Sequence, residues 1–362
     1  MTKITICGVG LIGGSIALCF KDKPGFHVTG HSNNPHSVAK LIKSTVVDHA
    51  TTSMLEAVED ADFIFLCVPV GALESYLLQL IELPLKKGCI ITDVGSTKLS
   101  ICLQAQELIP KGVTFIGGHP MAGSERSGVD AASIDLFENA FYVLTPSSNT
   151  PEWEIQRLMN LLQHTKAQVV QVDAQVHDNI VGAISHLPHI IAVALVNQIR
   201  KYHQSNPLYQ LLAAGGFRDL TRIASGDAYI WRDILINNRE VMLELLRDWN
   251  LEISHFIDLL QHQDGEGIAT QFREAGQFRS QLPERKKGII TTLYDVYIDV
   301  PDHPGIIGHI ATKLGNEHIN LSNVQIIESR IDVPGVLRLS FRSQDDLDRA
   351  VLLLSNEYMV HK

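Results

Sequence analysis

The chain has 362 residues, enough for two or three domains with cores of their own, which excludes a single small module. Hydrophobic residues make up 45% and charged residues 19%, a balance that excludes a disordered or collagen-like chain. The 30 basic residues against 40 acidic ones give a formal net charge of −10, which opposes attraction to nucleic acid or to an anionic membrane. We therefore expect no nucleic acid and no membrane partner.

Cysteine usage indicates a reducing compartment. The 5 cysteines are odd in number, form no C-x-x-C pair and belong to a chain too large to need disulfides, so we expect a cytoplasmic protein with free thiols. The apolar run at residues 4–20 contains four glycines and is followed by Asp22 and Pro24, which argues against a signal or an anchor. No other run is expected to approach a membrane span.

Up to about residue 150, short apolar runs alternate with helical patterns, which is typical of a doubly wound parallel sheet. The run at 63–68 is continuously apolar, as in a strand buried on both faces. With a last short run at 168–172, we expect a Rossmann-like domain over residues 1–172. Its other expected strands are 4–7, 28–30, 89–93, 113–117 and 142–145.

Helical patterns dominate the middle of the chain. Apolar residues recur every three or four positions and continue onto both sides of the expected helices. We therefore expect an all-helical domain over residues 173–282 that packs against a second copy, giving a homodimer. The expected helices are 174–203, 208–214, 230–249 and 253–261.

A polar stretch at 282–288 is typical of a linker, and beyond it the apolar period changes to two. Tyr294, Val296, Ile298 and Val300 alternate with polar neighbours. We expect a separate α+β domain over residues 289–362 in the order βαββαβ. Its expected helices are 306–315 and 347–354, and its later strands are 323–330, 336–342 and 358–361.

Gly8, Gly10 and Gly13 form a G-x-G-x-x-G motif between the first expected strand and a helix at 11–20. The first glycine permits a tight turn, the second lets a pyrophosphate approach the backbone, and the third packs helix against strand. Leu11 and Ile12 complete the turn, whose N–H groups face the phosphates. The motif predicts a dinucleotide site.

The end of the second expected strand carries Ser32 and Asn33 where an acid would select NAD. A carboxylate there binds the ribose 2′-hydroxyl and repels a 2′-phosphate, whereas Ser32 can hydrogen-bond to either. The residues alone leave NAD and NADP open.

Residues 117–124 (GGHPMAGS) follow an expected strand, where open α/β sheets bind their ligands. His119 precedes Pro120, which holds it extended, and an imidazole is well suited to take a hydroxyl proton near neutral pH. The segment predicts a general base. A glycine-rich turn without function is the alternative.

Ser96 lies in a similar position within residues 93–98, where it can contact substrate, cap the next helix, or do both. Residues 215–222 place Asp219 and Arg222 after two glycines. Solvated charge is the ordinary explanation, but an arginine at a cleft would hold a carboxylate bidentately.

His186 and His189 flank Pro188, which should kink their helix. Metal binding would need a nearby acid or thiol to complete the ligand set. We expect no metal site, and interpret the two as core or pocket histidines.

Taken in order, these motifs and the W-R-D at 231–233 resemble those of the prephenate dehydrogenase family over nearly the whole chain. Residues 300–305 (VPDHPG) and 318–321 (HINL) look like an ACT domain, as in the monofunctional bacterial enzymes. The resemblance implies NAD-dependent oxidative decarboxylation of prephenate to 4-hydroxyphenylpyruvate in tyrosine biosynthesis. It implies that His119 takes the ring hydroxyl proton while Ser96 orients both groups, and it favours NAD.

The resemblance also implies a substrate pocket and an effector site. Arg222 matches the carboxylate-binding arginine and His189 a second pocket histidine, while Trp231 matches a pocket-lining residue near the dimer interface. Glu125 and Asp219 match a polar gate that meets Arg222. L-tyrosine is the effector expected at the C-terminal domain, with Gly305 and Asn320 as its contacts.

Two other functions stay open. An arogenate dehydrogenase would act on a substrate with an amino group in place of the ketone of prephenate. A nucleotide-sensing regulator with an ACT domain would have no need for His119, Ser96 and Arg222 in one cleft.

Overall fold

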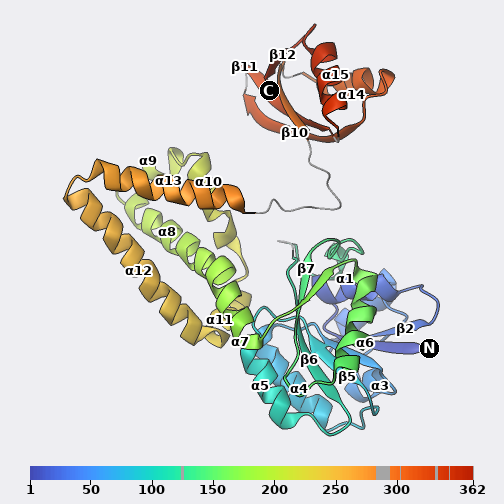
Figure 1. Cartoon of the computed structure of the whole chain (residues 1–362). Coiled ribbons are helices and arrows are strands. Elements are labelled where there is room, and N and C mark those ends of the chain that lie inside the picture. The colour runs from blue at the N-terminus through green and yellow to red at the C-terminus, as the bar shows by residue number, and fades with distance from the viewer. Residues whose placement is uncertain (124–125, 283–293, 302, 331–332, 342, 362) are drawn as a thin grey trace. The chain divides into compact units, whose positions relative to one another are not determined.

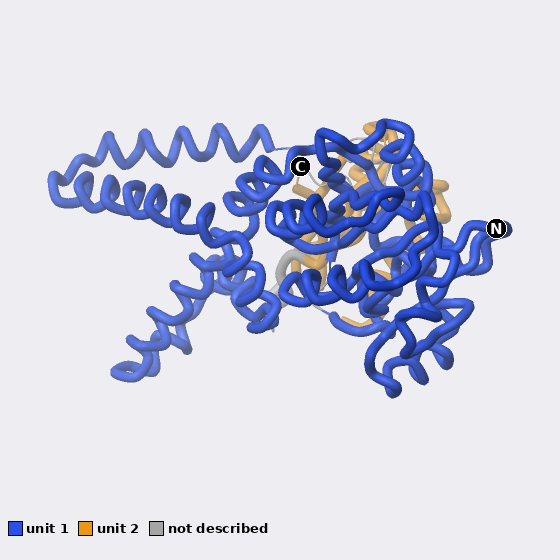
Figure 2. The backbone as a smooth tube through the Cα atoms, turned by 90° about the horizontal axis from the view of Figure 1, so that it is seen from below, with its two compact units in different colours: residues 1–283 blue, residues 284–362 orange. Residues whose placement is uncertain are grey.

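The computed structural model describes residues 1–123, 126–282, 294–301, 303–330, 333–341 and 343–361. The chain divides into two compact units, Met1–Pro283 and Glu284–Lys362, which are coloured separately in Figure 2. Each unit is described by itself.

The first unit begins with an eight-stranded sheet of strand order β3-β2-β1-β4-β5-β6-β7-β8. Its strands are β1 (Thr2–Cys7), β2 (Phe26–His31), β3 (His49–Thr51), β4 (Phe63–Leu66), β5 (Ile90–Asp93), β6 (Thr114–Pro120), β7 (Phe141–Thr145) and β8 (Gln168–Gln171). The expected Rossmann-like architecture is confirmed.

Helices cover both faces of this sheet (Figure 1). They are α1 (Leu11–Phe20), α2 (Pro35–Ser44), α3 (Met54–Val58), α4 (Leu73–Ile81), α5 (Leu99–Leu108) and α6 (Glu152–Leu162), with 3₁₀-helices η1 (Val70–Ala72), η2 (Val129–Ala131) and η3 (Gln163–Thr165). Phe63 and Phe65 of β4 belong to one buried cluster, whereas Ile64 and Leu66 belong to the other. Successive side chains therefore enter opposite layers, as expected for a strand buried on both faces.

The sheet differs from the sequence-based expectation at two strands. β7 runs antiparallel to β6, with His119 opposite Val143, so the expectation of a wholly parallel sheet was wrong there. No α-helix crosses over in the described part of residues 121–140, and a parallel strand needs such a crossover. The short strand β3, paired with β2, was not predicted.

The middle of the chain is all-helical, as expected. It consists of α7 (Ala174–Val181), the π-helix η4 (Gly182–His186), α8 (Leu187–His203), α9 (Leu208–Leu211), α10 (Gly215–Thr221), the 3₁₀-helix η5 (Arg222–Ser225), α11 (Ala228–Asn237), α12 (Arg239–Gln261) and α13 (Gly265–Gln281). The irregularity expected at Pro188 is present as the π turn before α8. The glycines at 215 and 216 are the first residues of α10. The break expected near residue 250 is absent, and α13 was not predicted.

The long helices α8, α12 and α13 extend away from the sheet (Figure 1). Only Ala192 is buried in α8 and only Met242 in α12, and none of the residues in α13 is buried. Large apolar side chains such as Leu243, Leu260 and Phe272 are exposed. Contrary to expectation, Ala174–His203 is long and apolar enough to cross a membrane by length and composition, a test that core helices of globular proteins also pass.

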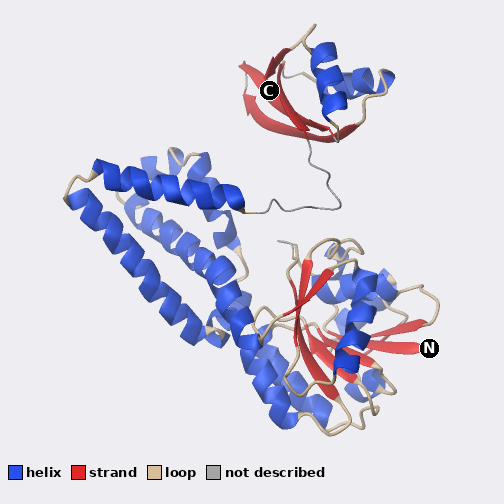
Figure 3. Ribbon diagram, in the orientation of Figure 1, coloured by secondary structure: helices blue, strands red, loops and turns tan. Residues whose placement is uncertain are grey.

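The second unit has the expected βαββαβ order: β9 (Tyr294–Val300), α14 (Ile306–Asn316), β10 (Leu321–Arg330), β11 (Val333–Phe341), α15 (Gln344–Leu354) and β12 (Met359–His361). The antiparallel sheet has the strand order β10-β11-β9-β12, with both helices beside it in Figure 3. Alternating residues Val296, Ile298 and Val300 enter the core, which confirms the period-two pattern.

Candidate active site

The glycine motif forms a cradle between β1 and α1. A side chain on Gly8 would lie 2.6 Å from the carbonyl oxygen of Cys67, and one on Gly13 would collide with the carbonyl of Gly8. A side chain on Gly10 would meet nothing within 4 Å, and Gly10 caps α1 with no side-chain hydrogen bond. The N–H groups of this turn, including Leu11 and Ile12, therefore fit a pyrophosphate.

The end of β2 is uncharged. Burial lowers the pKa of His31, the last residue of the strand, so its imidazole is neutral at neutral pH. The half-buried Ser32 follows, and its hydroxyl accepts the backbone N–H of Asn34 over 3.3 Å. This end of β2 thus has a hydroxyl where an acid would stand.

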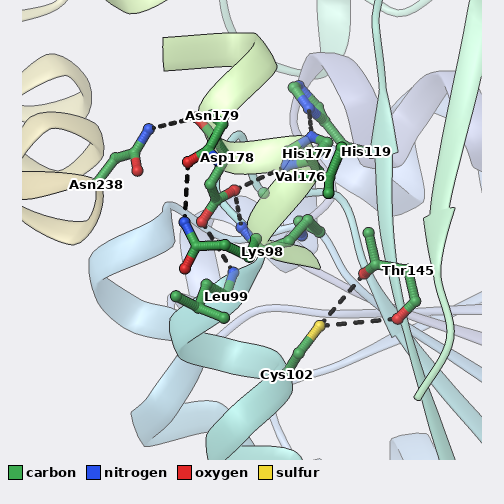
Figure 4. Close-up of polar contacts among 12 residues, drawn as sticks. Lys98, Leu99, Cys102, His119, Thr145, Val176, His177, Asp178, Asn179 and Asn238 are labelled. Carbon is green, nitrogen blue, oxygen red and sulfur yellow. Dashed lines mark hydrogen bonds and ion pairs between the residues drawn. The ribbon is translucent and has the colours of Figure 1, made fainter. Parts of the chain in front are cut away.

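His119 lies near the end of β6 and contacts a second histidine. Its Nδ1 is 2.8 Å from Nε2 of His177 in α7, and the rings meet edge to face at 75° (Figure 4). Burial lowers the pKa of His119 well below 6.5, and His177, Lys98 and His186 lower it further. The imidazole is therefore unprotonated at neutral pH and can accept a proton.

Asp178 joins α7 to the start of α5. Its Oδ1 accepts the backbone N–H of Lys98 over 2.7 Å, and its Oδ2 accepts that of Leu99 over 2.9 Å. The same Oδ1 lies 2.7 Å from Nδ1 of His177. The Asn238 side chain donates to the Asp178 carbonyl over 2.9 Å. His177 and Asp178 belong to no recognisable motif, because a His-Asp pair in an amphipathic helix is common.

A buried ion pair supports the end of β6 that carries His119. Lys98 and Asp93 are fully buried and hydrogen-bonded to each other. Oδ1 of Asp93 also accepts the backbone N–H of Gly118 over 3.1 Å. A side chain on Gly118 would lie 2.6 Å from the Asp93 carbonyl, so the glycine permits a close approach of β6 to β5. Sequence reasoning selected the segment 93–98 for Ser96 and assigned no role to the two charged residues at its ends.

Ser96 lies half-buried between β5 and α5. The α5 N-terminus is satisfied by Asp178, and Lys98 occupies the cap position, so Ser96 is not a helix cap. In the described part of the chain, Ser96 makes no hydrogen bond to His119.

The predicted substrate residues gather around a stacked ring pair. His189 of α8 lies against Trp231 of α11, with ring centroids 3.7 Å apart and planes at 28°. Burial lowers the pKa of His189, and the charge of Arg222 lowers it further. Arg222 begins the 3₁₀-helix η5, which packs against α8. Nδ1 of His189 donates to the Ser185 carbonyl over 2.7 Å.

His186 also lies beside this group. The ring centroids of His186 and Trp231 are 6.0 Å apart, and a positive charge on His186 would oppose protonation of His119. Of the two expected gate residues, Asp219 is exposed on α10, and Glu125 lies outside the described residues. The described residues contain no cluster of three or more His, Cys, Asp or Glu side chains that could hold a metal ion.

In the second unit, a pocket of about 360 Å³ lies at the start of α14. Gly305, with a φ of +93°, caps that helix without a side-chain hydrogen bond and lines the pocket. Asn320 is exposed and is not among the lining residues. The lining is completed by Val300, Pro301, His303, Ile306, Ile307, Gly308, Ile326, Gly335 and Leu337.

Comparison with known proteins gives consistent matches. Residues 16–171 match the model of the prephenate dehydrogenase nucleotide-binding domain, and residues 173–274 match that of the prephenate dehydrogenase dimerization domain. Prephenate dehydrogenase of Bacillus subtilis is 42% identical over 348 residues, covering 96% of this chain and 94% of the relative.

Two solved structures are similar to the first unit in size and fold. Prephenate dehydrogenase of Aquifex aeolicus, in complex with hydroxyphenyl propionate and NAD⁺, is 30% identical with a TM-score of 0.72, covering 78% of this chain and 99% of that one. Arogenate dehydrogenase of Synechocystis is 31% identical with a TM-score of 0.69, covering 78% of this chain and 100% of that one.

Proposed function

Since the chain belongs to the prephenate dehydrogenase family, and is an NAD-dependent oxidoreductase that converts prephenate to 4-hydroxyphenylpyruvate in tyrosine biosynthesis, we propose that His119 is its general base. The observation that carries this proposal is the neutral imidazole of His119 at the end of β6, beside the buried His177 and Asp178. A neutral imidazole at this edge of the sheet accepts a proton without first losing one.

The chemistry follows from the substrate. NAD, held by Gly8, Gly10, Leu11, Ile12 and Gly13, supplies the acceptor for the hydride that leaves the ring carbon bearing the hydroxyl.

His119 takes the hydroxyl proton, so that carbon becomes a ketone. The bond to the ring carboxylate then breaks, its electron pair enters the ring, and CO₂ departs. The ketone oxygen becomes the phenolate of an aromatic ring and takes the proton back from His119, which gives the hydroxyl of the product. Ser96 orients the hydroxyl toward His119.

Arg222 binds a substrate carboxylate in this proposal, with His189 and Trp231 as the adjoining pocket wall. The influence of the Arg222 charge on His189, and the stacking of His189 on Trp231, support their grouping. A guanidinium beside a neutral imidazole suits a dianionic substrate. Glu125 and Asp219 are proposed as the polar gate beside Arg222.

The reaction is tested by mixing the purified protein with NAD or NADP and with prephenate or arogenate, and following the absorbance of the reduced nicotinamide. We expect reduction with NAD and prephenate. Arogenate dehydrogenase activity is the second candidate, favoured by the similarity to the Synechocystis enzyme. Reduction in none of the four mixtures would contradict an enzyme and favour a nucleotide-sensing regulator.

L-tyrosine is proposed as an effector that binds the pocket at the start of α14. The N–H groups after Gly305 can hold a carboxylate, and the apolar lining can hold an aromatic ring. Asn320 is the second proposed contact.

A homodimer and a cytoplasmic location complete the proposal. The match to the family's dimerization domain and the exposed apolar helices support the homodimer. The free cysteines, of which Cys7, Cys19, Cys89 and Cys102 are buried, support the reducing compartment.

A further inference from the structure

We propose that His177 and Asp178 are positioning residues that decide which nitrogen of His119 carries its proton, so that Nε2 of His119 faces the substrate as an acceptor. The inference rests on the proposed role of His119 as the base. It follows from the donors and acceptors along one chain of contacts from α5 to β6 (Figure 4).

This series of hydrogen bonds starts at Asp178. Both of its carboxylate oxygens accept backbone N–H groups, Oδ1 from Lys98 and Oδ2 from Leu99. An ionised carboxylate only accepts hydrogen bonds. Nδ1 of His177, 2.7 Å from the Asp178 Oδ1, must therefore carry a proton and donate it.

The position of the proton on His177 then determines its position on His119. In this proposal His177 is neutral, so with its proton on Nδ1 it has a lone pair on Nε2. Because Nε2 of His177 lies 2.8 Å from Nδ1 of His119, the His119 nitrogen is the donor in that contact. The lone pair of His119 is left on Nε2, which has no hydrogen-bond partner among the residues with described side chains.

The same arrangement stabilises His119 after it has taken a proton. The resulting imidazolium still donates from Nδ1 to His177, behind which lies the negative charge of Asp178. Lys98 opposes the new charge, and its ion pair with Asp93 offsets part of that effect. A carboxylate that orients a catalytic histidine works on this principle, here with a second imidazole between them.

The contacts around His177 hold it rigidly. His177 and Asp178 are each only 2% exposed. Asp173 caps α7 by accepting the N–H groups of Gln175 and Val176, and Asn238 holds the Asp178 carbonyl. A purely structural role is the competing explanation, in which His177 only helps Asp178 to fasten α7 to α5.

Two amide variants of His177 separate these explanations. In His177→Gln, the amide reaches the place of Nε2 and can accept from His119, but its contact with Asp178 is lost. In His177→Asn, the shorter amide reaches the place of Nδ1 and can donate to Asp178, but it leaves His119 without an acceptor.

We expect His177→Gln to keep kcat within about 10-fold of the wild-type value and His177→Asn to lose about 10²-fold or more, with the KM values for prephenate and NAD unchanged in both. A structural role predicts the reverse order, with kcat following the thermal unfolding midpoint. A kcat for His177→Asn equal to or above that of His177→Gln would overturn the proposal.

The proton position is observed directly by ¹⁵N NMR of protein labelled at histidine. The His119 signals are assigned by their loss in His119→Asn. We expect a protonated Nδ1 and an unprotonated Nε2 in the wild type, and a mixture of the two forms in His177→Asn. A wild-type His119 protonated at Nε2 would refute the proposal.

The two proposals fail differently. If His119→Asn keeps the wild-type kcat, the base assignment and the positioning role both fall. If His119→Asn is inactive while the two His177 variants follow the structural order, only the positioning role falls.

Discussion

Asn238 donates a side-chain N–H to Nδ1 of His186 over 3.2 Å, and both side chains are buried. The amide nitrogen can only donate, so Nδ1 of His186 is an acceptor and the ring is neutral in the folded protein. The pKa of His186 is lowered from 6.5 to about 4, and burial is the largest cause. The free energy of unfolding therefore depends on pH through His186.

We predict that the free energy of unfolding falls as the pH drops from above 6.5 toward 4. In this window the unfolded chain binds a proton at His186 that the native protein excludes, so acid favours unfolding. The loss from this residue is about 3 kcal/mol over the whole window. Urea unfolding at fixed protein concentration, near neutral pH and at about pH 5, measures it. His186→Gln should show a clearly smaller pH difference, and an equal difference would contradict the assignment to His186.

Replacing the proposed base should lower turnover. His119→Asn keeps a polar side chain of similar size but removes the proton acceptor, so we expect kcat to fall by about 10²–10⁴-fold with little change in KM. Because burial keeps the pKa of His119 well below 6.5, the wild-type kcat should be constant through neutral pH and decline only in more acidic solution. Initial rates across pH check both points. An unchanged kcat in the variant at every pH would remove His119 from the chemistry.

Arg222→Ala should act mainly on substrate affinity. Loss of a charge-assisted contact to a carboxylate costs about 1.5–3 kcal/mol, which corresponds to a KM for prephenate raised about 10- to 150-fold. Arg222→Lys keeps the charge but not the paired donors, so its KM for prephenate should lie between those of the wild type and of Arg222→Ala. The KM for NAD serves as the internal control. If it rises equally, Arg222 has a structural role.

The exposed helices predict a dimer in solution. Leu243, Leu260 and Phe272 lie on faces of α12 and α13 that the described residues of the same chain leave exposed. A second copy would bury them, which is the main stabilising contribution in association. Light scattering in dilute buffer should give about twice the 40.1 kDa of one chain. A mass near 40.1 kDa would be inconsistent with the dimer.

Tyrosine inhibition can be tested by filling the proposed effector pocket. Gly308 lines the pocket, and a side chain added there meets nothing within 4 Å, so Gly308→Leu should block the ligand without disturbing the fold. Gly315→Leu, in the same helix and equally open, is not among the lining residues and is the matched control.

We expect tyrosine to raise the prephenate KM several-fold in the wild type and in Gly315→Leu, a coupling of about 1–3 kcal/mol, but not in Gly308→Leu. Deleting residues 289–362 should also abolish inhibition while leaving activity. If the shortened enzyme stays equally sensitive, tyrosine competes at the active site.

Apolar patterns predicted most elements of both units, because burial dictates them locally. They could not predict that β7 runs antiparallel to β6, since a period-two or continuous apolar pattern is the same in either direction. The helix α13 escaped detection because Gly265, Gly267 and Gly276 and many polar residues obscure its period. α12 continues through Asn250, where helix propensity alone is weak.

The candidate site was predictable only where motifs carry it. The glycine motif, His119 and Arg222 stand in recognisable local patterns. The contacts of His177 and Asp178 with β6 and α5 join residues 58 and 80 positions apart, and only the fold brings such pairs together. Conversely, the sequence could not show that Ser96 is free of a capping role, since that cap is supplied by Asp178.

The π turn Gly182–His186 determines which way three histidines point. In an uninterrupted α-helix each residue turns by about 100°, so His186 and His189 would project about 180° and about 120° away from His177. One extra residue in the turn reduces both angles by about 100°, so that His186 and His189 project about 80° and about 20° away from His177. A single helical rod can thus present His177 toward the base and His189 toward Arg222 from nearly one side. The number of residues in this π turn, more than their identity, therefore sets the directions in which the histidine side chains project.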